Sequence, residues 1–147
     1  MRTDERPPLL SRAAALALGG TGQRRGAPGW RHACHVLLYA PLPAAGIRHF
    51  GMQLRFDGRF GFPGGLVELA EESLEAGLHR ELREELGPAA DRLRLGRRHH
   101  RGAKAWPGSG SDVGLVTHFY IRRVRWEEMA AIERGGPRAP EHGLEVG

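Results

Sequence analysis

The sequence has little cysteine and no long apolar run. Cys34 is the only cysteine among the 147 residues, so an intramolecular disulfide is excluded, which fits a reducing compartment. Cys34 lies in the apolar stretch 33–39, and we predict that it is a small core residue and not a nucleophile. Because no stretch is long and apolar enough to cross a bilayer, a membrane span is excluded.

Lysine is almost absent, and the basic side chains are nearly all arginine. Lys104 is the single lysine. Lysine and arginine together number 22 against 17 aspartates and glutamates, which gives a formal net charge of +5. Arginine grips phosphate with a planar fork of donors, so this composition fits an anionic partner such as a nucleotide or RNA. Coding bias in a Gly-, Ala- and Arg-rich sequence explains the charge equally well.

The length allows one domain with a modest core. We predict that residues 1–29 form a flexible N-terminal tail with one short helix around residues 9–18, followed by a Gly/Arg/Pro linker. Residues 30–147 then make up the folded domain. The acidic residues and prolines within the first eight positions are not typical of a secretory signal.

Strand patterns surround one clear helix and indicate an α+β fold. Asp57-Gly58 is a strong two-residue hairpin signal between two strand-like runs. We predict strands at 32–40, 47–56, the start of 59–68, 92–95, 113–124 and 143–146. We predict a loop at 99–111 and a short helix at 127–134.

The clearest helix follows Ser73, which can cap its N-terminus. Glu75 then lies in the first turn, where a negative charge suits the helix dipole. Leucines at every fourth position from 74 to 86 form one apolar stripe. Gly87 and Pro88 predict the end of the helix.

Three carboxylates share one face of this helix. Glu81, Glu84 and Glu85 fall within roughly 100° of arc and would repel one another without a cation among them. Arg80 and Arg83 are expected to project to other sides, so a divalent cation with oxygen ligands would solve the problem better. The alternative is a solvated helix face with salt bridges. The loop at Pro63-Gly64-Gly65 favours the metal, because glycine lets the backbone approach a metal or phosphate.

This stretch resembles the Nudix signature, Gly-x5-Glu-x7-Arg-Glu-U-x-Glu-Glu-x-Gly-U, where U is a bulky aliphatic residue. The second half matches at Arg80, Glu81, Leu82, Glu84, Glu85 and Gly87, and Glu72 takes the earlier glutamate position. Two positions depart from the pattern. Leu66 stands where the first glycine is expected, with Gly65 displaced by one residue, and Pro88 takes the final aliphatic position.

The resemblance extends over roughly residues 29–147. Segments such as 29–35, 52–65, 118–120 and 142–146 are similar to the Nudix branch that decaps small nucleolar RNA and hydrolyses inosine diphosphate, and that shares the displaced glycine. The resemblance implies a Nudix fold with a mixed β-sheet sandwiched by helices. It also implies that the domain 30–147 is incomplete, with the C-terminal strand and helix missing. A paralogue of this branch, syndesmos, has lost the catalytic glutamates and works as a binding protein, whereas this sequence retains them.

The resemblance also implies roles for individual residues. Glu81, Glu84 and Glu85 would be catalytic and would bind Mg²⁺ or Mn²⁺, with Co²⁺ a further candidate. Gly64 would add its carbonyl to the metal ligands, and Arg80 would orient the glutamates. The remaining implied residues are His35, Arg55 and Phe62 for the purine nucleotide and Glu145 as an assisting glutamate. Taken singly, they are equally a core histidine, an exposed arginine, a core phenylalanine and a surface glutamate.

The implied activity is metal-dependent hydrolysis of a nucleoside diphosphate linkage. The expected substrates are (deoxy)inosine diphosphate, cleaved to the monophosphate, and capped small nucleolar RNA or mRNA. The expected location is the nucleus, with nucleolus and nucleoplasm, and the cytoplasm, and a homodimer is left open. Two alternatives remain: a catalytically inactive Nudix-like module that binds RNA or protein, and a hydrolase of another nucleotide.

Overall fold

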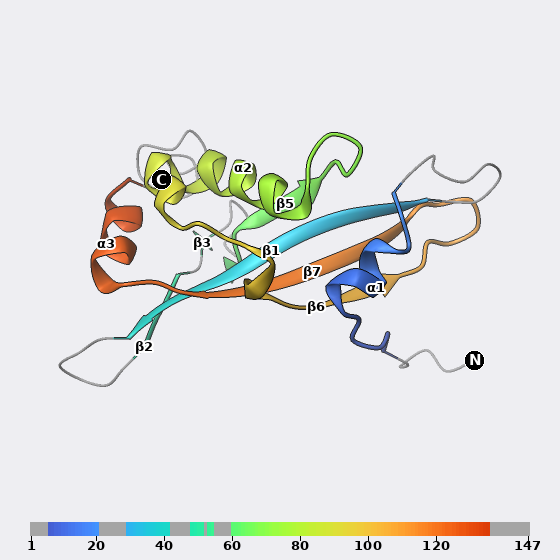
Figure 1. Cartoon of the computed structure of the whole chain (residues 1–147), viewed down its shortest axis with the longest axis horizontal. Helices are drawn as coiled ribbons and strands as arrows, with labels where there is room; N and C mark the ends of the chain where they lie inside the picture. Colours follow the sequence, from blue (N-terminus) through green and yellow to red (C-terminus); the bar gives the residue numbers. More distant parts are fainter. Residues whose placement is uncertain (1–5, 21–28, 42–47, 52, 55–59, 136–147) are drawn as a thin grey trace.

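The computed structural model describes residues 6–20, 29–41, 48–51, 53–54 and 60–135 (Figure 1). The helices are α1 (Arg12–Leu16), α2 (Leu74–Leu86) and α3 (Trp126–Gly135), with short 3₁₀ helices η1 (Pro88–Arg92) and η2 (Arg97–His99). The strands are β1 (Trp30–Pro41), β2 (Arg48–Gly51), β3 (Gln53–Leu54), β4 (Phe60–Gly61), β5 (Gly64–Val67), β6 (His100–Trp106) and β7 (Gly114–Arg123).

The main sheet is mixed, with the strand order β2-β1-β7-β6. β1 and β7 run parallel in the centre, whereas β2 and β5 pair antiparallel with β1, and β6 pairs antiparallel with β7. β3 and β4 form a separate antiparallel pair around the predicted hairpin turn, whose own residues 57–58 lie outside the described residues. The mixed sheet and the accompanying helices confirm the α+β prediction.

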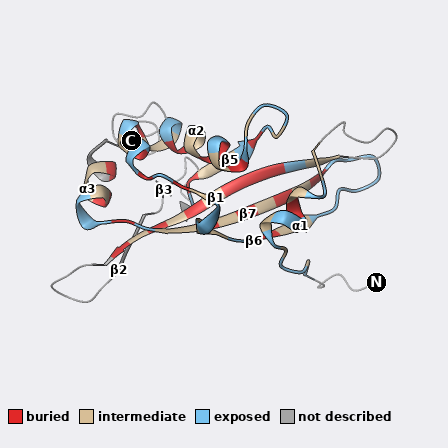
Figure 2. Ribbon diagram, viewed as in Figure 1, coloured by how far each residue is buried: buried red, intermediate tan, exposed pale blue. Residues whose placement is uncertain are grey.

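The core lies between the sheet and α2. Along β1, Cys34, Val36, Leu38 and Ala40 are buried, while the residues between them are half-buried on the other face. This alternation follows from the two-residue period of a strand. The stripe of α2 packs onto the buried face through Leu74, Leu78 and Leu82, which are 0–1% exposed (Figure 2). Cys34 is fully buried and burial raises the pKa of its thiol to about 12, which confirms the core assignment.

The short N-terminal helix is present, but it is packed into the fold. Leu10 pairs with Ala103 of β6 through two backbone hydrogen bonds. Ala15 is fully buried against Ala103 and Val116. The sequence predicts a flexible tail with one short helix over residues 1–29. Within this range, residues 10–16 pack against β6 and β7, because the small alanine side chains allow a close approach. The boundary at residue 29 stays a prediction.

Two predictions after α2 are wrong. Residues 92–95 do not form a strand, because their backbone groups bond to side chains and not to a neighbouring strand. Leu95 N–H donates to His79 Nε2 at 2.9 Å, and the Leu93 carbonyl accepts from Arg122 Nε at 2.8 Å. Residues 100–106, expected in a loop, form β6 and pair with β7.

The predicted elements at 113–124 and 127–134 are confirmed as β7 and α3. The predicted strand at 143–146 lies outside the described residues. No helix in the described ranges is long and apolar enough to cross a membrane.

Candidate active site

The rotation of α2 is set by its cap and its leucine stripe. The Ser73 hydroxyl accepts a hydrogen bond from Ala76 N–H at 3.1 Å, which confirms Ser73 as the N-cap. With the leucines turned into the core, the face that carries Glu81, Glu84 and Glu85 is turned towards β5 and solvent. Gly87 ends the helix with a positive φ of 86° and donates its N–H to the Arg83 carbonyl.

Two glycines of β5 let this strand lie close to both β1 and α2. Gly64 has a φ of 145°, and a Cβ built there would lie 1.9 Å from the Cys34 carbonyl oxygen. A Cβ on Gly65 would lie 2.6 Å from the Glu81 carboxylate. Gly64 N–H donates to Glu85 Oε1 at 3.3 Å. The glycine loop therefore contacts both Glu81 and Glu85, as the metal-site hypothesis requires.

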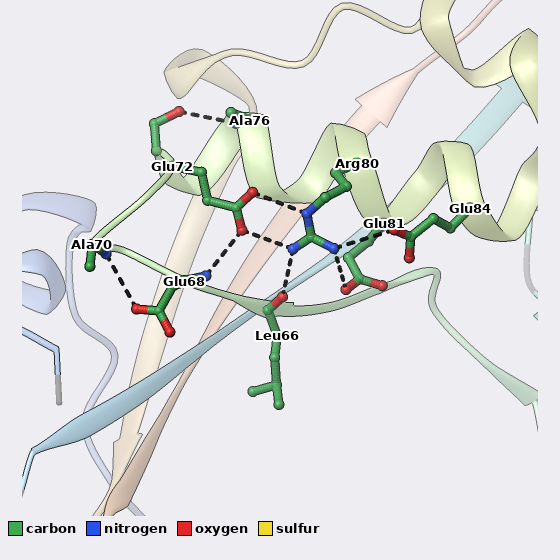
Figure 3. A network of polar contacts seen from close by, with 9 residues as sticks. Leu66, Glu68, Ala70, Glu72, Ala76, Arg80, Glu81 and Glu84 are labelled. Atoms are coloured by element: carbon green, nitrogen blue, oxygen red, sulfur yellow. Dashed lines mark hydrogen bonds and ion pairs between the residues drawn. The ribbon is translucent and has the colours of Figure 1, made fainter.

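Arg80 lies at the centre of the acidic cluster (Figure 3). Its guanidinium donates to both oxygens of Glu72 at 3.0 and 2.8 Å, to Glu81 Oε1 at 3.1 Å and to the Leu66 carbonyl at 3.2 Å. Glu84 Oε1 lies 3.6 Å from Nη1. The expectation that Arg80 points to another side of the helix is wrong, because the helical angle sets only the direction of Cβ and a long side chain can turn back. The orienting role implied for Arg80 fits these contacts.

The charges of the cluster are unevenly balanced. The hydrogen bond from Arg80 lowers the pKa of Glu72, and the same contact raises the pKa of Arg80. For Glu81, burial raises the pKa, and the contacts with Arg80 only partly oppose this while Glu84 and Glu72 add to it. A half-buried carboxylate with too little positive charge around it is a suitable ligand for a further cation.

The residues fit a hard divalent cation in donor type and in place. All candidate ligands are oxygen atoms, and Glu81 and Glu85 both contact the glycine loop. Within the described ranges, however, no three His, Cys, Asp or Glu side chains already converge on one point. Arg80 accounts for this, because it holds Glu72, Glu81 and Glu84 around its guanidinium. Binding of a cation therefore requires the Glu81 and Glu84 side chains to turn away from Arg80.

The predicted nucleotide-binding residues are partly brought together. His35 is half-buried on the sheet face away from α2 and pairs with both Gly64 and Phe119. Phe62 is 38% exposed, and its ring meets Phe119 edge to face with centroids 5.4 Å apart. Phe119 was missed from the sequence, because only the parallel pairing of β1 with β7 places it beside His35. Arg55 and Glu145 lie outside the described residues.

Comparison with protein-family models shows the family to which the chain belongs. A family model described as Nudt16-like, U8 snoRNA-decapping enzyme-like, matches residues 32–147. The chain belongs to this family. The mixed sheet with its helices is the Nudix fold expected for a Nudt16-like protein.

Relatives within the Nudt16-like family carry two different names. The U8 snoRNA-decapping enzyme of Bos taurus is 52% identical over 128 residues, which are 81% of this chain and 62% of that protein. The Tudor-interacting repair regulator protein of Homo sapiens is 37% identical over 146 residues, which are 93% of this chain and 61% of that protein. A solved structure titled as an Ap4A hydrolase of C. elegans aligns with a TM-score of 0.49 at 18% identity, covering 65% of this chain and 68% of that one. The chain thus spans somewhat less than two thirds of the two named relatives.

Proposed function

We propose that this chain is a Nudix-type hydrolase that cleaves a nucleoside diphosphate linkage with the help of a divalent metal ion. The proposed substrates are (deoxy)inosine diphosphate and the 5′ cap of small nucleolar RNA or mRNA. The observation that carries the proposal is the contact of the α2 glutamates with the Gly64–Gly65 loop. The name of the bovine relative supports cap removal.

In this proposal Glu81, Glu85 and the Gly64 carbonyl hold Mg²⁺ or Mn²⁺, and Co²⁺ is a further candidate. The bound metal would polarise the phosphate and make water more acidic. Glu84 is 54% exposed, and its contact with Arg80 is long at 3.6 Å, so in this proposal it turns towards an attacking water and takes its proton. Arg80 keeps Glu72 in place when Glu81 and Glu84 turn away from its guanidinium.

The nucleotide would bind across the opposite side of β5. Phe62 offers an exposed ring to stack on a purine, and His35 offers a ring nitrogen as a hydrogen-bond partner. Arg55 would grip phosphate with its guanidinium. Gly64 joins the two parts, since it pairs with His35 and donates to Glu85.

Replacing single glutamates by glutamine tests the proposal. Glu84→Gln and Glu85→Gln remove a carboxylate without changing size, and each should lower turnover of inosine diphosphate by about 100-fold or more, the scale of a lost acid–base group. Glu71→Gln, at an exposed position outside the cluster, is the matched control and should leave turnover unchanged.

Two further readouts accompany these variants. Mn²⁺ binding, followed by electron paramagnetic resonance, should weaken in Glu85→Gln, whereas thermal unfolding should be unchanged. Full turnover in purified Glu84→Gln or Glu85→Gln would contradict the proposed hydrolase function. A hydrolase of another nucleotide is recognised by screening inosine diphosphate, capped RNA and dinucleoside polyphosphates side by side.

A non-catalytic binding module is the second candidate. It is favoured by Arg80, whose guanidinium holds Glu72 and Glu81 by hydrogen bonds, and by the name of the human relative. Absence of turnover on every substrate of the screen, together with measurable RNA binding, would establish it. The nuclear and cytoplasmic location and the homodimer stay predictions.

A further inference from the structure

Beside α2 the surface carries a group of arginines that form no ion pair with a described acidic residue. We call Arg94, Arg97, Arg98, Arg101 and Arg122 the arginine surface. They come from the segment between α2 and β6, from the start of β6 and from the adjoining end of β7. Residues 92–111 contain five arginines and one lysine but no aspartate or glutamate. The positive charge of this segment is therefore not balanced within the segment.

Hydrogen bonds to backbone carbonyls orient two of these arginines, and three of them lie near His99. Arg122 Nε donates to the Leu93 carbonyl at 2.8 Å, and Arg101 Nη1 donates to the Arg98 carbonyl at 2.8 Å. Together with a further bond from Arg122 Nη1 to the Arg123 carbonyl, these bonds fix the direction of two guanidiniums. His99 lies among the positive charges of Arg98, Arg101 and Arg122, and burial together with these charges lowers its pKa.

His99 adds an uncharged donor to this surface. Its Nδ1 accepts a hydrogen bond from Gly96 N–H at 3.0 Å, so the ring proton of the neutral form lies on Nε2. The arginine surface therefore combines several guanidinium groups with the neutral Nε2–H of His99.

Nothing in the described part of the chain neutralises this surface. The ion pairs there that involve arginine use Arg12, Arg80, Arg83 and Arg125, none of which belongs to it. The nearest acidic residue along the chain, Asp91, is 3.8 Å from Arg83. An ordinary solvated face of a protein mixes both signs of charge, whereas oriented guanidiniums of one sign suit an anionic ligand with many phosphates.

We propose that the arginine surface binds the sugar–phosphate backbone of RNA, in the part of a capped substrate that lies beyond the cap. This rests on the proposed decapping function. Guanidiniums with few aromatic neighbours suit phosphates and not bases, so the contact is expected to be independent of sequence.

The position of the surface relative to the glutamates determines which RNA can reach it. The Leu95 N–H bond to His79 places the segment alongside α2. His79 and Glu81 are two residues apart on the helix, so they point about 200° away from each other. A cap with one or two nucleotides carries few phosphates beyond the cap, whereas a longer RNA can pass around the helix and offer many phosphates to the arginine surface. The arginine surface therefore favours long capped RNA over a capped dinucleotide.

Charge reversal tests the surface directly. Arg98→Glu/Arg101→Glu changes the charge of the surface, and Arg6→Glu/Arg31→Glu makes the same change at exposed positions elsewhere. Binding of labelled, uncapped single-stranded RNA is measured by fluorescence anisotropy at several salt concentrations. The surface variant should bind about tenfold more weakly or worse at low salt, and its salt slope should shrink by about 0.7 for each phosphate that the protein no longer neutralises. The control variant should match the unaltered protein.

Decapping assays separate the two proposals. The surface variant should lose efficiency on long capped RNA, through a raised KM, more than on a capped dinucleotide. RNA binding that is unchanged in the surface variant, or equally weakened in the control, would overturn the arginine surface. If the unaltered protein hydrolyses no nucleotide but the surface variant still loses RNA binding, the proposed function fails and the surface stands. The milder pair Arg98→Gln/Arg101→Gln gives the same comparison should charge reversal impair folding.

Discussion

Gly64 and Gly65 are neighbours in sequence, but a side chain at each would meet different obstacles. At Gly64 the obstacle is backbone, the Cys34 carbonyl, and the φ of 145° is itself unfavourable for any other residue. At Gly65 it is the far end of the Glu81 side chain, which can move aside. One glycine is therefore needed for folding and the other for the position of a proposed metal ligand.

Alanine substitutions should separate these two requirements. We expect Gly64→Ala to lower the free energy of unfolding by about 3 kcal/mol, from strain and backbone overlap. Gly65→Ala should change it by less than about 1 kcal/mol while lowering turnover and Mn²⁺ affinity at least tenfold, because Glu81 is displaced.

Gly96→Ala is the control, since its added Cβ would meet nothing within 4 Å. Urea denaturation and Mn²⁺ titration of the three variants check the expectation. Equal loss of stability in Gly64→Ala and Gly65→Ala would contradict it.

At the scale of elements, an ion pair links α1 to α2. Arg12 of α1 binds both oxygens of Glu75 at 2.9 and 2.7 Å, and the Tyr120 hydroxyl of β7 donates to Glu75 at 2.6 Å. Burial opposes ionisation of Glu75, but these hydrogen bonds still hold its pKa below the ordinary value. The start of the proposed catalytic helix thus depends on the N-terminal helix.

Removing Arg12 should therefore loosen α1. Arg12→Ala leaves the Glu75 carboxylate, 14% exposed, without its cation, and we expect the free energy of unfolding to fall by about 2 kcal/mol. Arg6→Ala, at an exposed position, should have no measurable effect. Urea denaturation and limited proteolysis near residues 10–20 are the measurements. Unchanged protease resistance of Arg12→Ala would show that α1 does not need this ion pair.

Local signals predicted α2 well, and pairing between distant segments was harder to predict. The Ser73 cap, the leucine stripe and the Gly87 terminus act within a few residues, so the sequence suffices to locate the helix. β6 was missed because its strand character comes from pairing with β7 and not from its own polar residues. Phe119 was missed for the same reason, because its place beside His35 comes from the pairing of β1 with β7. The position of the Arg80 guanidinium depends on which carboxylates lie within reach of its long side chain.

Across the whole molecule, a chain of histidines joins three strands to the segment after α1. His32 Nε2 lies 2.9 Å from the Gly19 carbonyl, His32 Nδ1 lies 2.9 Å from His118 Nε2, and His118 Nδ1 lies 2.9 Å from His100 Nε2. Because a carbonyl only accepts, His32 donates from Nε2. Burial lowers the pKa of both His32 and His118, which favours the neutral rings. With both rings neutral, His118 donates to His32 and His100 donates to His118.

Acid should destabilise the fold through this chain. Burial lowers the pKa of His118 to about 3, so between that value and the unfolded pKa of about 6.5 only the unfolded state takes up the proton. Stability is complete above about pH 6.5 and is lost as the pH falls, by about 2 kcal/mol at about pH 5 from this residue alone.

Urea denaturation at several pH values measures this loss. His118→Gln, which can still donate and accept, should show a smaller dependence on pH between about 7 and 5, although its stability at the upper pH is lower. The same dependence on pH in both proteins would exclude His118 as its origin.

The parallel pairing of β1 with β7 also has a consequence for biosynthesis. Trp30 pairs with Gly114 and Tyr39 with Arg123, so the central pair of the sheet joins segments from opposite ends of the described chain. As the chain leaves the ribosome, β1 can first pair with β2 and β5, and its other edge stays unpaired until β7 has been made. An unpaired apolar strand edge is prone to association with other chains. The interval between the synthesis of β1 and that of β7 is therefore the time in which a nascent copy of this protein most needs protection by a chaperone.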